Sequence, residues 1–126
     1  MNASCFKNVH GMILVYDISD KNSFNNLMKW NELIEKNAKK GIIKILVGNK
    51  CDKIDRVVSE EEGENFAMDN NYIFCETSAR NDINVKEVFN LISKKILKAV
   101  EENKLIYQMN PRLAKKSHDK KNCFII

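Results

Sequence analysis

The chain has 126 residues, of which 44% are hydrophobic and 30% charged, and its net charge at neutral pH is +4. That is about one ordinary globular domain, and its apolar runs are too short to span a bilayer. The four cysteines have no metal-ligand spacing, and the N-terminus has no secretory signal, so we expect a reduced cytosolic compartment.

The first half of the chain predicts a strand, a helix and a second strand. Gly11 opens an apolar run over residues 12–17 that is typical of a buried strand. Apolar residues then recur near helical spacing over residues 23–39, which predicts an amphipathic helix that Gly41 ends. A β-branched apolar run from Ile43 to Gly48 predicts the second buried strand.

The second half of the chain repeats this alternation. Ser59 and the three glutamates after it form an N-cap with a capping box, which predicts a helix to about Asn70. Residues 72–76 predict a third strand, and residues 82–84 lead into a long helix that Asn110-Pro111 ends. We expect one side of that helix to carry its apolar residues, which are Val85, Val88, Phe89, Ile92, Ile96, Leu97 and Val100.

Strands that alternate with helices predict an α/β fold in which helices cover the faces of a parallel sheet. Ligands of such sheets bind just beyond the carboxyl ends of the strands. Asn49-Lys50-Cys51-Asp52 follows the second strand, and Thr77-Ser78-Ala79-Arg80 follows the third. The two polar loops are therefore expected side by side at one edge of the sheet.

The side chains of these loops suit recognition of guanine. An ionised Asp52 can accept the adjacent N1–H and N2–H donors of guanine, a pair that adenine lacks. We expect the Asn49 amide to donate to a ring nitrogen and the Lys50 stem to lie along the base. The Ala79 N–H could donate to O6, and the Ser78 hydroxyl could hold Asp52. Either loop alone is also typical of a polar turn, and only the two together favour a base site.

Residues 4–104 resemble the second half of a small GTPase of the Ras superfamily, most of all the Rab branch. The matching segments are His10-Gly11, Met12 to Ser19, Ser23-Phe24, Trp30, Gly48 to Asp52, and Glu76-Thr77-Ser78-Ala79. The resemblance implies a partial P-loop-NTPase-type sheet, three strands alternating with three helices, within residues 1–104. It also implies that Asn49, Lys50, Asp52, Ser78 and Ala79 bind guanine. Arg80 stands where the family usually has Lys, and its aliphatic stem can still cover the base.

The chain contains no G-x-x-x-x-G-K-[ST] motif and only four glycines, so it has no glycine-rich loop that could cradle phosphates. By the resemblance, the first three strands, the first helix, the switches, the metal-binding Ser/Thr and the water-positioning Gln are missing. We expect GTP or GDP as ligand, Mg²⁺ only in a complete form, no catalytic or metal-binding residue here, and no hydrolysis by this chain alone. A truncated gene model, an alternative start and a partial product all remain open.

The absence of the family's first strand has a consequence for the sheet. That strand pairs beside the strand predicted at residues 12–17, so we expect this strand to have an unpaired edge, which favours aggregation. The long C-terminal helix is expected to lose part of its packing surface for the same reason.

Residues 105–126 predict a flexible basic tail with a lipid anchor. Five cations, at positions 112, 115, 116, 120 and 121, outnumber the single Asp119. The final Cys123-Phe124-Ile125-Ile126 fits a C-a-a-X signal in which Cys123 accepts a prenyl group, and the apolar Ile126 favours geranylgeranyl over farnesyl. The alternative for the basic run is a solvated, disordered segment.

The resemblance implies a protein of vesicle traffic and intracellular protein transport that binds guanine nucleotides. Its expected partners are Rab-type regulators and effectors and, through the prenyl group and the basic tail, a membrane; no nucleic acid is expected. Its expected place is peripheral, on the cytosolic face of intracellular membranes. The alternative is a truncated, non-catalytic, lipid-anchored interaction module without GTPase activity.

Overall fold

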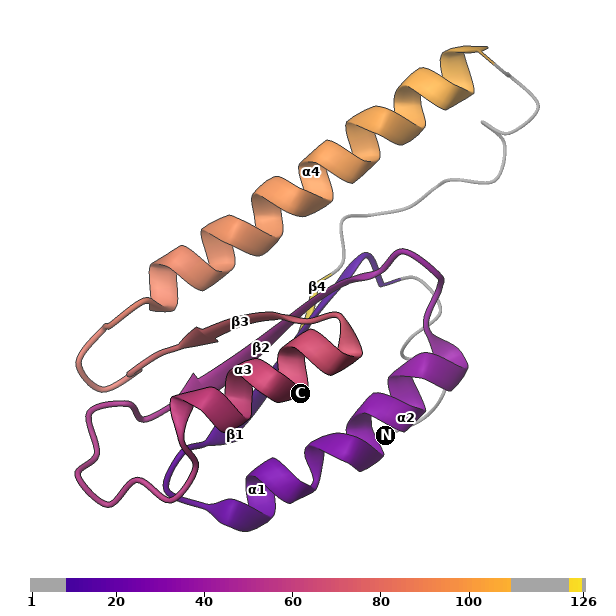
Figure 1. Cartoon of the computed structure of the whole chain (residues 1–126). Helices are drawn as coiled ribbons and strands as arrows, with labels where there is room; N and C mark the ends of the chain where they lie inside the picture. Colours follow the sequence, from indigo (N-terminus) through magenta and orange to yellow (C-terminus); the bar gives the residue numbers. More distant parts are fainter. Residues whose placement is uncertain (1–8, 110–122, 126) are drawn as a thin grey trace.

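A computed structural model of the chain describes residues 9–109 and 123–125 (Figure 1). The basic run predicted at residues 112–121 lies outside these residues. Helices and strands alternate along the chain as β1 (Gly11–Asp17), α1 (Lys21–Asn25), α2 (Leu27–Asn37), β2 (Ile43–Asn49), α3 (Glu60–Asn70), β3 (Ile73–Glu76), α4 (Val85–Met109) and β4 (Cys123–Ile125). The α/β fold predicted from the sequence is confirmed, with β4 as an additional strand.

The four strands form one parallel sheet in the order β3-β2-β1-β4. All seven residues of β1 pair with β2, from Gly11 opposite Ile43 to Asp17 opposite Asn49. Strand β3 pairs with β2 up to Gly48 opposite Glu76. Because β1, β2 and β3 end at the same level, the loops that follow them emerge at one edge of the sheet.

Alternate residues of the strands supply two apolar cores, because successive side chains of a strand point to opposite faces. On one face, Leu14, Tyr16 and Leu46 pack with residues of α2, α3 and the loops. On the other face, a cluster from the sheet and α4 comprises Ile13, Ile45, Val47, Val88, Ile92 and Ile96. Accordingly, α4 lies on one side of the sheet, and α1, α2 and α3 lie on the other (Figure 1).

The helix predicted over residues 23–39 is two helices, α1 and α2, which meet at Asn26. Helix α1 begins before Ser23 because the Asp20 carboxylate accepts the N–H groups of Asn22 and Ser23 and so acts as its N-cap. Helix α2 ends at its C-cap, Ala38, before Gly41. The capping box at Ser59 is present as predicted, and α3 follows it.

Helix α4 buries only part of its apolar side against the sheet. Val88, Ile92 and Ile96 are buried, whereas Phe89 and Leu97 have exposed fractions of 46% and 40%. The apolar residues that the sequence places on one side of α4 are therefore not all buried. The buried sheet residues of this cluster come from β1 and β2, and Ile73 and Cys75 of β3 are partly buried against it.

The outer edge of β1 is not unpaired, so that prediction is wrong for its first half. Strand β4 lies beside β1, with Cys123, Phe124 and Ile125 opposite Gly11, Met12 and Ile13. At the other end of this edge, the Asp17 N–H donates to Ser23 Oγ at 3.0 Å. Both ends of an edge that would otherwise favour pairing with another chain are thus occupied.

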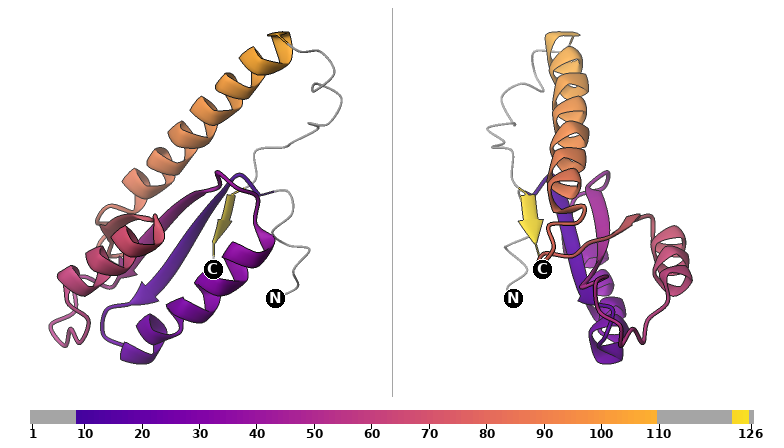
Figure 2. Two further views of the ribbon diagram at one scale, coloured as in Figure 1. Left: turned by 45° about the vertical axis from the view of Figure 1, so that its right-hand side comes forward. Right: turned by 90° about the vertical axis from the view of Figure 1, so that its left-hand side faces the viewer.

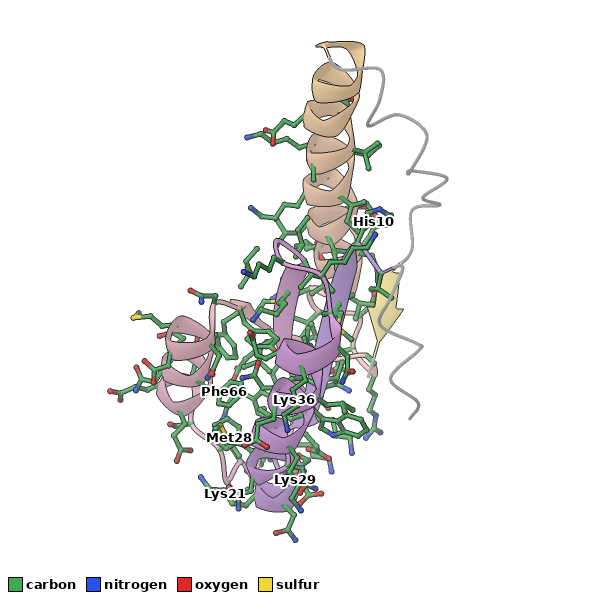
Figure 3. The ribbon with its side chains drawn as sticks, turned by 90° about the vertical axis from the view of Figure 1, so that its right-hand side faces the viewer. His10, Lys21, Met28, Lys29, Lys36 and Phe66 are labelled. Atoms are coloured by element: carbon green, nitrogen blue, oxygen red, sulfur yellow. The ribbon has the colours of Figure 1, made fainter. Side chains whose placement is uncertain are left out.

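Helix α3 is joined to α1 and α2 by aromatic and ionic contacts. Phe66 projects from α3 toward α2 (Figure 3), and its ring centroid lies 6.0 Å from those of both Phe24 and Tyr72. Lys21 Nζ lies 2.8 Å from Glu62 Oε1 and 5.2 Å from the Phe24 ring centroid.

Among the described residues, no helix has the length and apolarity needed to cross a membrane.

Helix α3 approaches the sheet closely at Gly63, which predicts a cost for any side chain there. A β-carbon at this position would lie 2.4 Å from Tyr16 Oη and 2.6 Å from the Phe74 ring. We expect Gly63→Ala to lower the free energy of unfolding by about 1–3 kcal/mol, the usual cost of overpacking. Urea denaturation measures it. Glu64→Ala, on the exposed side of α3, is the control and should change stability by less than about 0.5 kcal/mol; an equally small effect of Gly63→Ala would contradict the close contact.

Candidate functional site

The two predicted loops meet at the carboxyl edge of the sheet and are tied together through the main chain. The Cys51 N–H donates to the Thr77 carbonyl at 3.0 Å, and the Thr77 N–H donates to the Gly48 carbonyl at 2.8 Å. These hydrogen bonds extend the pairing of β2 with β3 into the loops. The side chains of Asn49 and Asp52 therefore lie beside residues 77–80, as the order of the strands predicted.

Asn49 is oriented by the second loop. Its Oδ1 accepts hydrogen bonds from Thr77 Oγ1 at 3.1 Å and from the Ala79 N–H at 3.3 Å. With the acceptor atom turned inward, Nδ2 remains as the donor, and it has no partner among the described residues. The Ala79 N–H, which the sequence suggested for guanine O6, is directed at Asn49 in this structure.

Asp52 is held by the fully buried Ser78. The Ser78 hydroxyl donates to Asp52 Oδ1 at 2.6 Å and accepts the Asn81 N–H at 3.1 Å. The hydrogen bond from Ser78 lowers the pKa of Asp52 below its ordinary value. The carboxylate is thus ionised at neutral pH and fixed at one oxygen, while the described residues give Oδ2 no hydrogen bond.

Lys50 makes an ion pair that the sequence did not predict. Its Nζ lies 2.5 Å from Asp17 Oδ2, and its backbone has a positive φ of 66°. Asp17 Oδ1 also accepts the N–H and the hydroxyl of Ser19, at 2.9 and 2.6 Å. Partial burial raises the pKa of Asp17, but the hydrogen bonds from Lys50 and Ser19 outweigh it and lower that pKa to about 2. The sequence did contain a signal for this ion pair: Asp17 ends the first predicted strand, and parallel strands end at the same edge of the sheet.

These side chains surround a pocket with a volume of about 290 Å³, lined by Asn49, Lys50, Asp52, Lys53, Ala79 and Arg80. Five of the six residues predicted for base binding line it, and Ser78 lies behind Asp52. A smaller apolar pocket of about 130 Å³ between the sheet and α4 also touches Asn49 and Ala79. The larger pocket combines a fixed carboxylate, an amide donor and three long cationic side chains, which suits a flat ring with adjacent N–H donors.

Neither a metal site nor Cys123, the residue predicted to accept a lipid, belongs to this pocket. Among the described residues, no three His, Cys, Asp or Glu side chains are grouped so that they could hold a metal ion. Cys123 is in β4, opposite Gly11 at the start of β1, whereas the pocket lies at the strands' carboxyl ends.

In open α/β folds that bind nucleotides, the ligand lies beyond the carboxyl ends of parallel strands, where this pocket lies. A model of the Ras family matches residues 1–98, and the chain belongs to that family.

Curated relatives agree with this assignment. Ras-related protein Rab-13 of Rattus norvegicus is 41% identical over 93 residues, which are 73% of this chain and 46% of the relative. GTP-binding protein ypt1 of Schizosaccharomyces pombe is 38% identical over 82% of this chain and 51% of its own length. Ras-related protein SEC4 of Saccharomyces cerevisiae is 38% identical over 80% and 47%. The chain thus spans about half the length of these curated relatives.

The ion pair between Asp17 and Lys50 predicts a stability that depends on pH. Because the pKa of Asp17 in the folded chain is lowered to about 2, the stabilisation is present above its unfolded pKa of about 3.9 and is lost as the pH falls toward 2. We expect Asp17→Asn to lower the free energy of unfolding by about 1 kcal/mol at pH 7, since the pair is partly exposed. Denaturation of parent and variant from pH 7 to pH 2 measures the difference, which should shrink between about pH 4 and pH 2. A difference that stays constant to pH 2 would contradict the ion pair.

Proposed function

We propose that this chain carries the guanine-recognition part of a Rab-like small GTPase that acts in vesicle-mediated transport. The observation that carries the proposal is the hydrogen bond from buried Ser78 to Asp52, which fixes an ionised carboxylate in the lining of the pocket. Relatives named as GTP-binding and as Rab proteins support it. In the proposal, the loops at residues 49–52 and 77–80 bind guanine, as the resemblance to small GTPases implies.

In this proposal Asp52 selects guanine by accepting N1–H and N2–H. Its pKa is lowered by Ser78, so it stays charged at neutral pH and needs no rearrangement to accept both donors. Asn49 donates from Nδ2 to a ring nitrogen, because Thr77 and Ala79 occupy its Oδ1. Guanine O6 approaches the Ala79 N–H and competes there with Asn49, whose 3.3 Å hydrogen bond is long and correspondingly weak.

Lys50 and Arg80 cover the faces of the base in this proposal. Both line the pocket, and both carry aliphatic stems that can pack on a ring while their charged ends stay in water. The ion pair with Asp17 restrains the Lys50 stem before the ligand arrives. Such preorganisation lowers the entropy that binding would otherwise lose.

The proposed activity of this chain is binding rather than hydrolysis. Phosphoryl transfer needs phosphates held in place, a metal ion and an oriented water. Guanine recognition by a few hydrogen bonds, of about 1 kcal/mol each and about 2 for the charged one, corresponds to a dissociation constant near millimolar. Mg²⁺ and tight binding belong to a complete form of the protein.

The C-terminus supplies the membrane attachment in this proposal. The Cys123 thiol forms a thioether with an isoprenoid carbon as the bond from that carbon to diphosphate breaks; diphosphate leaves with the electron pair, and the thiol proton passes to water. One lipid chain gives reversible binding, and the cations at residues 112–121 add attraction to anionic lipids. The protein would then lie on the cytosolic face of intracellular membranes, where Rab-type regulators and effectors reach it.

Substitution of Asp52 tests guanine recognition directly. We expect Asp52→Asn to weaken GDP binding about tenfold or more and to strengthen binding of xanthosine diphosphate, because xanthine has a C2 carbonyl that an amide can donate to and a carboxylate repels. Chemical-shift titrations with each nucleotide measure both affinities. Asp55→Asn, an exposed charge change three residues away, is the matched control and should leave the preference for guanine unchanged. An unchanged preference in Asp52→Asn would show that Asp52 does not recognise the base.

Substitution of Cys123 tests the membrane anchor. We expect Cys123→Ser to move the protein from the membrane fraction to the soluble fraction of cells, because cations alone are screened by salt. Replacing the five cations with Gln should leave the lipid attached but reduce the membrane-bound share. Cys5→Ser removes a thiol elsewhere and should fractionate like the parent. If Cys123→Ser pelleted with membranes as the parent does, the prenylation proposal would be wrong.

A further inference from the structure

A bidentate ion pair outside the pocket lining joins the loop after β2 to the end of β3. Arg56 Nη1 donates to Glu76 Oε1 at 2.6 Å, and Nη2 donates to Glu76 Oε2 at 2.7 Å. Nη1 also donates to the Val58 carbonyl at 3.0 Å. The Glu76 side chain has an exposed fraction of only 14%, so solvent screens this pair less than a surface pair. A guanidinium that holds both carboxylate oxygens fixes the orientation of both groups.

The register of the sheet places Glu76 on the face where Arg56 binds it. Tyr16, Gly48 and Glu76 lie opposite one another on β1, β2 and β3, and their side-chain positions therefore share one face. The Tyr16 ring lies across Gly48, because a β-carbon there would be 2.8 Å from Tyr16 Oη. Tyr16 Oη is buried and has no hydrogen-bond partner among the described residues. Arg56 thus provides the counter-charge of a carboxylate in surroundings that offer it little else.

Glu76 leads directly into the loop that holds Asp52. Ser78 is two residues further along the chain, and its hydroxyl donates to Asp52 Oδ1 at 2.6 Å. The Glu76 carbonyl accepts Asn84 Nδ2 at 3.0 Å, and the main chains of Ser78 and Ile83 exchange two hydrogen bonds, of 3.1 and 2.9 Å. This loop is therefore a closed unit attached to the sheet at Glu76. A movement of Glu76 is passed on to Ser78.

Arg56 provides the side-chain link from the other loop. Figures 1 and 2 show the loop between β2 and α3 and the loop between β3 and α4 at the same end of the sheet. Among residues 53–58, all of which the structure describes, Arg56 is the one whose side chain hydrogen-bonds to β3. The neighbouring Ile54 and Val57 side chains are exposed, and the main chain of this segment is held at Ile18, whose carbonyl accepts the N–H groups of Val57 and Val58.

We propose that Arg56 and Glu76 are positioning residues of the guanine site, whose ion pair holds Ser78 where it can orient the Asp52 carboxylate. This inference rests on the proposed guanine site. Neither Arg56 nor Glu76 lines the pocket, so neither touches the base. Without Arg56, the largely buried Glu76 carboxylate has no counter-charge. It then turns toward water, and the end of β3 and the loop with Ser78 move with it.

The pKa of Asp52 tests the positioning without any nucleotide, because the hydrogen bond from Ser78 lowers that pKa. The chemical shift of the Asp52 carboxyl carbon, followed from pH 7 to pH 2 in the full chain, measures it. We expect Arg56→Ala and Arg56→Lys both to raise this pKa toward its ordinary value, since an ammonium group does not hold both oxygens of Glu76. A rise in Arg56→Ala alone would reflect only the lost charge and would overturn the proposal, as would no rise in either variant.

The preference for GDP over inosine diphosphate tests the consequence for the base. Inosine lacks the N2 amino group, so this preference measures how well Asp52 is placed to accept it. A hydrogen bond to a charged group corresponds to about a tenfold preference, which we expect to fall to about twofold in Arg56→Ala and Glu76→Gln. Chemical-shift titrations with both nucleotides measure it. A variant that is merely less stable loses affinity for both nucleotides by the same factor and keeps the preference.

Lys21→Ala is the matched control for these variants. It removes another ion pair between separate elements, with Glu62 at 2.8 Å, in which neither loop takes part. The pKa of Asp52 and the preference for GDP should both remain as in the parent. Should Arg56→Ala not fold, Arg56→Lys and Glu76→Gln carry the same two tests.

The outcomes separate the positioning from the recognition of guanine. A preference that persists in Arg56→Ala and Glu76→Gln would overturn the positioning and leave guanine recognition by Asp52 intact. A parent chain without any preference for GDP over inosine diphosphate would overturn guanine recognition and, with it, the part of Arg56 and Glu76 in base selection. A raised pKa of Asp52 in Arg56→Lys together with a reduced preference supports both.

Discussion

The full-length pairing of β1 with β2 is the constraint on which the rest of the structure depends. Seven consecutive pairs bring the ends of both strands to one level, so that Asp17 lies opposite Asn49. The loop after β3 then joins the loop after β2 through main-chain hydrogen bonds between residues 48, 51 and 77. A shift of β1 by one residue in this register would turn its own core side chains to the other face of the sheet and would move Asp17 away from Asn49.

Charge in the candidate site is organised by short polar contacts rather than by burial. Ser78 holds Asp52, and Lys50 holds Asp17, and in both cases hydrogen bonds lower the pKa of the carboxyl group. A neutral serine leaves Asp52 its full negative charge for a ligand. Lys50 neutralises Asp17 at the end of β1. Of the two carboxylates at this edge, Asp52 therefore offers a negative charge to a ligand, whereas the charge of Asp17 is paired.

The two edges of β1 serve different parts of the molecule. Toward β2, the strand sets the register of the site; on the outer side, it meets the chain's own C-terminus and Ser23. An apolar strand with an open edge can pair with almost any extended segment, because main-chain groups carry little sequence information. The identity of the segment that lies there is therefore decided by which part of the chain reaches that edge.

The sequence by itself determined the α/β class, the capping box of α3 and the two polar loops, because alternation of apolar runs, cap residues and strand ends are local signals. It also placed five of the six candidate base-binding residues around one pocket, since parallel strands end together. Only the tertiary structure decided that Lys50 pairs with Asp17, that Phe89 and Leu97 stay exposed, and that residues 123–125 pair with β1. Each of these depends on which segments meet across the sheet, and no local pattern specifies such long-range contacts.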